Sequence, residues 1–290
     1  MTCNIGLFHV TPDMQADPAI VARAAEDLGF NSYWLPEHAI LPAEFRSNYA
    51  GDLESKMVEP PDHLWKMPDP WIGLARASAV TSTLRLGTAI CLVPEHNPLI
   101  LANEVASLDH YSGGRVNFGI GAGWNREESE ILGVDFDHRW TQTRECVEIM
   151  KALWTNDSAG YDGHYYNFPP VRCYPKPAQN PYPPIYFGSI GSPRVLQRVA
   201  KWGNGWVPLT NDFDELARGR ERLNQLCAET GRDPTSISIA QMATEGRSRT
   251  LAERVEAERA GVNEVIVWII ETKLNAVLDE LKALANELIE

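Results

Sequence analysis

The stretch RLGTAICLVPEHNPLILANEVASLDHYSGGRVNFGIGAGW, residues 85–124, reads as a strand, a helix and a second strand. Its apolar runs at 85–93 and 115–124 are short, as expected of strands that are buried on both faces. Between them, residues 98–112 have a helical pattern that ends at Gly113-Gly114. A strand, a helix and a strand in this order favour a parallel sheet covered by helices.

The same alternation continues on both sides of this stretch. Further strands are predicted at 3–10, 32–38, 184–191, 205–210, 236–242 and 264–270, and further helices at 17–30, 69–80, 126–132, 138–155, 192–203, 212–231, 251–261 and 271–288. Eight strands with helices between them, in a chain of 290 residues, predict a single α/β domain over 1–290 with the (β/α)8 TIM-barrel fold. A doubly wound open sheet is the alternative. No composition break or linker supports a second domain.

Two long segments interrupt the alternation, one after the second strand (39–67) and one before the fifth (156–183). Neither has a clear period, so both are predicted to be irregular loops that cap a pocket. They contain the aromatic residues Tyr49, His63, Trp65, Tyr161, Tyr165 and Tyr166. These fit an apolar or aromatic substrate and fit ordinary loop packing equally well.

Composition limits the partners. The net charge of −13 argues against a nucleic-acid binder and against electrostatic docking on anionic membranes. The five cysteines are odd in number and widely spread, which does not support a disulfide framework or a zinc site. No signal-peptide pattern and no apolar run of membrane-spanning length is present. The sequence predicts a reduced, cytoplasmic protein.

Active sites of TIM barrels lie where the strands end, and three such ends carry candidate residues. His38 ends the second strand and is a candidate proton donor or acceptor, while its neighbour Glu37 points to the opposite strand face. Gly119, Gly121 and Gly123 remove side chains from one strand face, where either a flat ring or a close-packed neighbour would fit.

The third strand end runs from Gly188 through Ser189 and Ile190 to Gly191, before Ser192-Pro193 opens a helix. Glycines and the N–H groups of a helix start can bind a phosphate, although the same pattern also makes a ligand-free tight turn. Taken together, the three strand ends fit a flat, phosphorylated cofactor across the barrel mouth.

Several segments resemble the luciferase-like monooxygenase superfamily, whose TIM barrels use FMN or the deazaflavin F420. They are GFNSYWLPEH, LRLGTAICLVPEHNPLILANEVASLDHYSGGRVNFGIGAGWNREE, RECVEIMKALW and IYFGSIGSPRVLQRVAKWGNGWVP. The resemblance covers roughly residues 3–270 and implies roles for individual residues. It implies a catalytic role for His38. It also implies cofactor contacts for Ala89 and Ile90, which match a bulge behind the ring that often has a cis peptide, and for Gly121, Gly123, Asn125, Gly188, Ser189, Ile190 and Gly191.

The cofactor prediction rests on a departure from the family pattern. Some flavin-using relatives have an Arg where this chain has Ala122. Its absence favours F420, and we expect hydride transfer between F420 and a small organic substrate. The alternative is an FMN-dependent monooxygenase that uses O2 and a separate cofactor reductase, and a minor alternative is a cofactor-free ligand-binding barrel. The resemblance also implies a homodimer. No metal site is expected.

Overall fold

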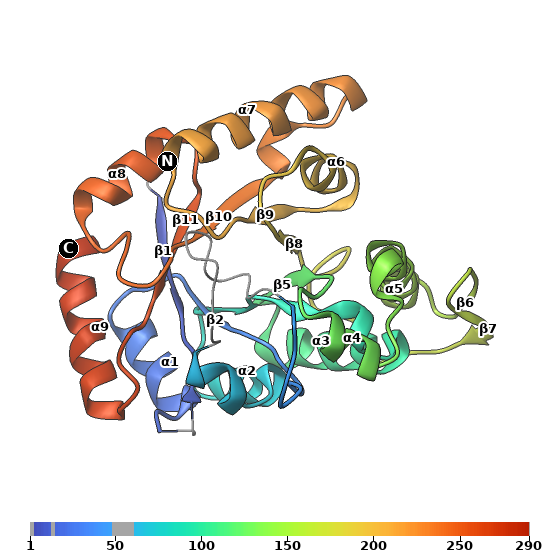
Figure 1. Ribbon diagram of the computed structural model, residues 1–290, viewed down its shortest axis with the longest axis horizontal. Helices are drawn as coiled ribbons and strands as arrows, with labels where there is room; N and C mark the ends of the chain where they lie inside the picture. The colour runs from blue at the N-terminus through green and yellow to red at the C-terminus, as the bar shows by residue number, and fades with distance from the viewer. Residues whose placement is uncertain (1–2, 13–14, 48–60, 290) are drawn as a thin grey trace.

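A closed parallel barrel is the centre of the computed structural model, which describes residues 3–12, 15–47 and 61–289 (Figure 1). Neighbouring strands pair in parallel in the order β3-β2-β1-β11-β10-β9-β8-β5, and pairing of β3 with β5 closes the ring. The strands of the barrel are β1 (Asn4–Phe8), β2 (Ser32–Leu35), β3 (Arg85–Thr88), β5 (Val116–Gly121), β8 (Ile185–Gly188), β9 (Gly205–Val207), β10 (Ser238–Met242) and β11 (Glu264–Trp268). The TIM-barrel prediction is confirmed, and the open sheet is excluded.

Helices cover the outside of the barrel, as Figure 1 shows. Several begin with an Asp, Asn or Ser cap followed by Pro, for example Asp69 before Pro70 and Ser192 before Pro193, and this pattern fixes where each helix starts. The helices are α1 (Pro18–Asp27), α2 (Pro70–Ser78), α3 (Pro98–Ser112), α4 (Arg126–Ile131), α5 (Arg139–Thr155), α6 (Pro193–Trp202), α7 (Phe213–Thr230), α8 (Leu251–Arg259) and α9 (Leu274–Leu288). Short 3-10 helices are η2 (Asp62–Lys66), η3 (Val93–Glu95), η4 (Phe136–His138) and η5 (Pro234–Ser236). In the described part of the chain, no helix is long and apolar enough to span a bilayer.

The barrel interior is filled by side chains, with Trp34 of β2 at its centre and fully buried. A Cβ atom at Gly87 would lie 2.1 Å from the Trp34 ring, so only glycine leaves room for this indole. The indole N–H donates to the Ser32 hydroxyl, which donates to the buried carboxylate of Glu264 at 2.6 Å. The interior is therefore a packed core, and a ligand can bind only above it.

Two predicted elements differ from the structure. The predicted strand 85–93 is divided into β3 and β4 (Cys91–Leu92), and the peptide between Ala89 and Ile90, which lies between them, is cis. The predicted loop 156–183 contains an antiparallel hairpin, β6 (Ala159–Asp162) and β7 (Asn167–Val171). Pro169 and Pro170 interrupt the alternating pattern from which a strand is predicted, so the second strand of the hairpin was not predicted. A strand at the edge of a sheet nevertheless tolerates prolines.

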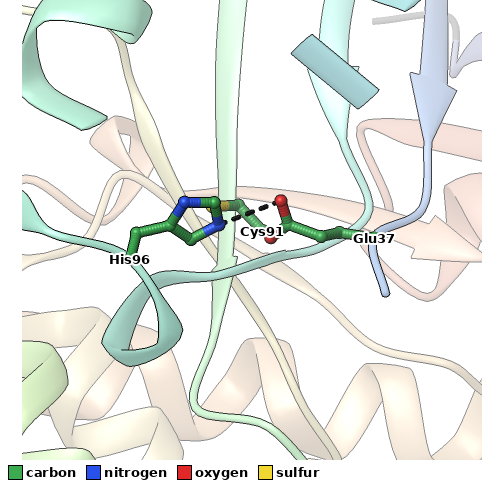
Figure 2. Close-up of side chains that lie close together, drawn as sticks. All are labelled: Glu37, Cys91 and His96. Atoms are coloured by element: carbon green, nitrogen blue, oxygen red, sulfur yellow. Dashed lines mark hydrogen bonds and ion pairs between the residues drawn. The ribbon is translucent and has the colours of Figure 1, made fainter. Parts of the chain in front are cut away.

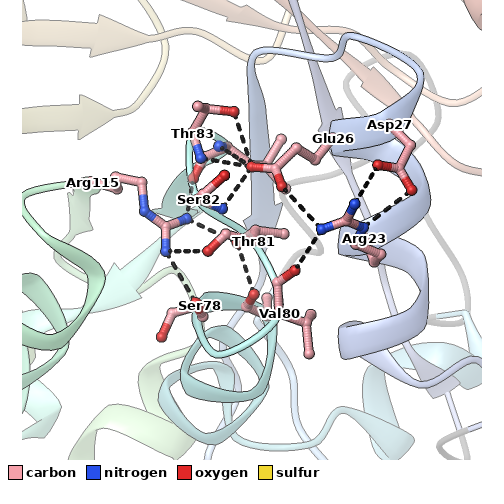
Figure 3. Close-up of polar contacts among 11 residues, drawn as sticks. Arg23, Glu26, Asp27, Ser78, Val80, Thr81, Ser82, Thr83 and Arg115 are labelled. Carbon is pink, nitrogen blue, oxygen red and sulfur yellow. Dashed lines mark hydrogen bonds and ion pairs between the residues drawn. The ribbon is translucent and has the colours of Figure 1, made fainter.

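A polar cluster holds the opposite end of the barrel, where the strands begin (Figure 3). Oε1 of Glu26 accepts hydrogen bonds from the backbone N–H groups of Ser82, Thr83 and Leu84 at 2.6–2.9 Å. Nearby, the Arg115 guanidinium donates to the Leu84 carbonyl at 2.7 Å and to other carbonyls of the same turn. The start of β3 is thus fixed by the charged side chains of Glu26 on α1 and of Arg115, which precedes β5, far from the candidate site.

Candidate functional site

A cavity of about 540 Å³ opens at the C-terminal ends of the barrel strands. That volume is typical of pockets for small molecules and cofactors. Most of its walls are apolar, with a few polar groups among them. The lining residues are Phe8, Val10, Pro36, Glu37, His38, His63, Leu64, Met67, Ala89, Ile90, Leu92, Ala122, Gly123, Trp124, Arg139, Trp140, Gly188, Ser189, Ile190, Val207, Leu209, Met242 and Trp268.

His38 is held from both ring nitrogens. Its Nδ1 lies 2.7 Å from Oε2 of Glu128, and Trp124 Nε1 donates to its Nε2 at 3.2 Å. Because an indole N–H can only donate, Nε2 must accept, and the proton of the neutral ring therefore sits on Nδ1. The Glu128 side chain is 1% exposed and that of His38 is 8% exposed. A buried carboxylate that accepts from Nδ1 fixes the tautomer and the orientation of a histidine ring, an arrangement that can serve proton transfer at the other nitrogen.

Glu37 also lines the cavity, and its carboxylate is held by two partners (Figure 2). Its Oε2 accepts from the backbone N–H of Leu92 at 2.6 Å, and its Oε1 lies 3.0 Å from Nε2 of His96. The buried carboxylate is thereby paired, as a carboxylate in this position must be. The pair belongs to two Pro-Glu-His tripeptides, at 36–38 and 94–96, which follow the neighbouring strands β2 and β3 and contact each other through Glu37 and His96.

Cys91 lies beside this pair, and the potential ligand atoms of Glu37, Cys91 and His96 are within 4.8 Å of one another. Metal binding by cysteine requires the thiolate. Burial, reinforced by the Glu37 charge, raises the pKa of Cys91 well above its ordinary value, and Glu37 and His96 already satisfy each other. The cluster therefore has the properties of a structural ion pair.

A further carboxylate, Glu95, accepts a hydrogen bond from the Ser129 hydroxyl at 2.7 Å. A Cβ atom at Gly123 would lie 2.9 Å from Oε1 of Glu95, so this side chain sits directly behind the cavity wall. Burial, followed by repulsion from Glu128, raises the pKa of Glu95 to about 8. Glu95 is therefore largely protonated at neutral pH. The acidic residue that contacts His38 is Glu128 and not Glu95.

The bulge at Ala89 and Ile90 shapes the floor of the cavity. A Cβ atom at Gly121 would lie 2.1 Å from Cδ1 of Ile90, and one at Gly188 would lie 2.3 Å from Cγ2 of Ile90. The glycines of β5 and β8 thus make room for the Ile90 side chain, and Gly119 makes room for the Thr88 carbonyl. From the sequence, either a flat ring or a close-packed neighbour could lie against the strand face that these glycines leave bare. In the structure, protein atoms lie there, and the Ile90 side chain lines the cavity.

The end of β8 and the loop that follows it form an adjacent part of the cavity wall through Gly188, Ser189 and Ile190. Ser192 caps α6 by accepting from the Val195 N–H, as its position before Pro193 predicts. Gly191 does not line the cavity, and a Cβ atom there would lie 2.9 Å from the Trp206 ring. Its lack of a side chain therefore serves packing against the core.

Arg139 and Trp140, at the start of α5, line the cavity but were not identified from sequence. Nε of Arg139 donates to the Gly123 carbonyl at 3.1 Å, and its Nη1 donates to the Phe136 carbonyl at 2.8 Å. Burial, with repulsion from Arg126, lowers the pKa of Arg139. The signal available in the sequence was a cation in the first turn of a helix, where the helix dipole disfavours it.

The remaining expectations have mixed outcomes. Asn125 is fully buried as the cap of α4, accepts from the Glu128 N–H at 3.0 Å and does not line the cavity. Glu128 was missed because its contact with His38 spans 90 residues of sequence.

The two long loops contribute differently to the cavity: His63, Leu64 and Met67 from the described part of 39–67 line it. Of their aromatic residues, His63 lines the cavity, Trp65 is 42% exposed, and Tyr49 lies outside the described residues. Residues 156–183 contribute nothing to the described cavity lining. Instead, the Tyr166 hydroxyl accepts a hydrogen bond from Nε2 of Gln142 on α5 at 3.1 Å, so this loop packs against that helix.

Comparisons with known proteins agree with this geometry. The family model described as luciferase-like monooxygenase matches residues 14–285. The uncharacterized protein Rv0953c of Mycobacterium tuberculosis is 39% identical over 230 residues, which is 79% of this chain and 80% of that protein.

Solved structures show the same fold. An F420-dependent secondary alcohol dehydrogenase, solved with an F420–acetone adduct, superposes with a TM-score of 0.75 and 20% identity, covering 98% of both chains. The FMN complex of the oxygenating constituent of 3,6-diketocamphane monooxygenase from Pseudomonas putida has a TM-score of 0.64 and 20% identity, covering 83% of this chain and 67% of that one.

Proposed function

The chain belongs to the luciferase-like monooxygenase family, and on that basis we propose that it transfers a hydride between the deazaflavin F420 and a small organic substrate. The observation that carries the proposal is the Glu128–His38 pair at the cavity wall. Oxidising an alcohol or reducing a carbonyl requires one proton to move with each hydride. A histidine with a fixed tautomer and a buried carboxylate behind it is suited to move that proton in either direction.

The cavity fits a flat cofactor with a phosphate. Ile90 offers an apolar surface on which a ring can lie, and the close approach of Gly121 and Gly188 keeps that surface in place. The backbone at Gly188, Ser189 and Ile190 would hold the phosphate, with Arg139 as the cation in the same cavity. The bound deazaflavin would supply or accept the hydride.

The protein's own contribution is proton transfer, orientation and exclusion of water. When an alcohol is oxidised, Nε2 of His38 accepts the hydroxyl proton, and the Glu128 carboxylate stabilises the resulting imidazolium through Nδ1. In the reverse direction, Nε2 returns the proton to the carbonyl oxygen. The substrate hydroxyl takes the position of the Trp124 N–H as the partner of Nε2, so this contact must loosen during turnover.

Ketones and secondary alcohols are the first substrates to examine. The alcohol dehydrogenase of the same fold was solved with an acetone adduct of F420. A relative that is 27% identical over 250 residues is named as a phthiodiolone/phenolphthiodiolone dimycocerosates ketoreductase of Mycobacterium bovis; the match covers 82% of this chain and 64% of that protein. The apolar cavity walls are consistent with such substrates.

An FMN-dependent monooxygenase is the second candidate, and Arg139 is the observation that favours it. The argument for F420 used the absence of an Arg at Ala122. However, Nε of Arg139 bonds to the carbonyl of the adjacent Gly123, so a guanidinium from α5 reaches the same wall. The missing Arg at 122 therefore separates the two cofactors less sharply than the sequence suggested. This reading would also require a separate reductase and O2.

Cofactor titration tests the proposal. The purified protein should bind F420 with micromolar or tighter affinity and FMN more weakly, followed by the absorbance and fluorescence of each cofactor. Reduced F420 should then be reoxidised by a ketone, and His38→Asn should bind F420 normally while failing in that reaction. Tight FMN binding without F420 binding would replace the proposal by the monooxygenase, and binding of neither cofactor would favour the ligand-binding barrel.

A further inference from the structure

Three arginines around one side of the cavity make no ion pair with a carboxylate of the described residues. They are Arg139 in the cavity wall and Arg194 and Arg198 on α6. Arg139 bonds only to backbone carbonyls and lies 3.9 Å from the centroid of the Phe136 ring. In contrast, Arg126 on the neighbouring α4 pairs with both Glu130 and Asp137.

The side chain of Arg198 on α6 contacts a residue of the cavity wall. Its guanidinium carbon lies 4.6 Å from the ring centroid of Trp140, which lines the cavity. The Trp140 ring is also stacked with Phe187, the residue before Gly188, at a centroid distance of 6.1 Å. Arg198 therefore lies beside the same wall as the Gly188–Ile190 backbone.

Arg194 precedes Arg198 by one helical turn, so both side chains share a face of α6. Arg194 is exposed and stands in the first turn of α6, where the helix dipole disfavours a cation. Burial, with repulsion from Arg194, lowers the pKa of Arg198, so the two positive charges are close together. The protein as a whole has a net charge of −13, but these two neighbouring arginines are not paired with a carboxylate of the described residues. Together they form a small positive surface that attracts a polyanion.

One acidic group lies near the loop that precedes α6. Oε1 of Glu215 on α7 is 3.5 Å from the position of a Cβ atom at Gly191. Its other carboxylate oxygen accepts from the Thr210 hydroxyl at 3.0 Å. Glu215 thus limits the positive surface on the α7 side and leaves the Trp140 side open to an anion.

We propose that Arg194 and Arg198 bind the carboxylates of an acidic ligand tail that leaves the cavity past Trp140. This inference rests on the proposed use of F420, whose phosphate is followed by a lactyl group and a chain of glutamates. FMN ends at its single phosphate and has nothing for this surface to bind. Arg–carboxylate pairs of this kind form charge-assisted hydrogen bonds that salt screens.

A series of deazaflavins of increasing tail length tests the inference. The probes are FO, which has no phosphate, F420-0, which has the phospholactyl group but no glutamate, and F420 with several glutamates. The wild-type protein should bind F420 more tightly than F420-0 by about fivefold at low ionic strength, as expected for two exposed ion pairs. This gain should disappear in Arg194→Gln/Arg198→Gln and at high salt, while FO affinity stays unchanged.

Two variants keep the result interpretable. Arg194→Gln removes an exposed cation that makes no hydrogen bond or ion pair with a carboxylate of the described residues, so a folding defect is not expected. This variant alone should lose about half of the gain on a logarithmic scale. Arg222→Gln on α7 removes an arginine that is paired with Glu229 at 3.4 Å and should keep the full gain. Equal affinity of the wild-type protein for F420-0 and F420, or an undiminished gain in the double variant, would overturn the tail site and leave the proposed function intact. If the wild-type protein does not bind F420 at all, both the tail site and the proposed function are overturned.

Discussion

Glu26 should make the stability of this barrel depend on acid pH. Its carboxylate is 11% exposed and accepts three backbone N–H groups and the Thr83 hydroxyl, all at Oε1. Burial alone would raise the pKa of Glu26, but the N–H groups of Thr83, Leu84 and Ser82 outweigh it and lower the pKa from 4.5 to about 2. The charged form is therefore the form that the folded protein prefers.

The size of the effect follows from this pKa difference. At about 1.4 kcal/mol per pKa unit, a fall from 4.5 to about 2 corresponds to about 3 kcal/mol of folding free energy. Because the unfolded chain binds this proton more tightly, the contribution is complete above pH 4.5 and is lost as the pH falls toward 2. Glu26→Gln keeps the accepting oxygen Oε1 and removes only the charge, so it should cost about 2–3 kcal/mol at pH 7.

Urea unfolding at several pH values between 3 and 7, followed by tryptophan fluorescence and circular dichroism, measures this. The difference between the wild-type protein and Glu26→Gln should shrink steadily below pH 4.5. As a control, Glu130→Gln removes a 53% exposed carboxylate paired with Arg126 and should cost less than about 1 kcal/mol. A Glu26→Gln difference that is the same at every pH, or no larger than that of the control, would refute the reasoning.

Three further predictions concern the site. His38→Asn should lower turnover by about 10²–10⁴-fold with little change in cofactor affinity, and near-normal turnover with chemistry rate-limiting would make His38 a structural residue. Glu128→Gln should lower turnover in the wild-type background but not in His38→Asn, because Glu128 acts through His38; steady-state kinetics of the double-mutant cycle tests this, and additive losses would contradict it. Gly188→Ala places a Cβ atom 2.3 Å from Ile90, displaces the side chain on which the ring would lie and should weaken cofactor binding about tenfold, as a titration would measure; unchanged affinity in a folded variant would contradict this.

The barrel and the location of the cavity were accessible from sequence because both depend on local patterns. Alternating short strands and helices predict the fold, and the fold fixes where strands end. His38 was therefore identified at such an end before any contact was known, whereas Ile90 was identified through the family resemblance. The hairpin at β6 and β7 was missed because its prolines interrupt the period on which the strand prediction depends.

The partners of the site were not accessible, because they are contacts between distant segments. Nothing near Glu128 in sequence indicates that its carboxylate turns toward His38 rather than capping α4. The cation in the wall was sought at Ala122, beside Gly123, but it comes from Arg139 on another helix. The sequence pattern identifies the strand on which a side chain is expected. The same place in the cavity wall can instead be occupied by a side chain from a distant helix, as it is here by Arg139.

The pairing of the two Pro-Glu-His tripeptides through Glu37 and His96 affects how sequence variation among relatives should be interpreted. Glu37 and His96 are chemically one unit, as are His38 and Glu128, although each unit joins residues that a linear motif would assign separately. Substitutions should therefore be inherited in pairs, with position 37 covarying with 96 and position 38 with 128. A homologue that has lost His96 but kept the first tripeptide intact would have a buried, uncompensated carboxylate in its catalytic wall. Such a homologue should lose activity even though every residue in contact with its substrate is preserved.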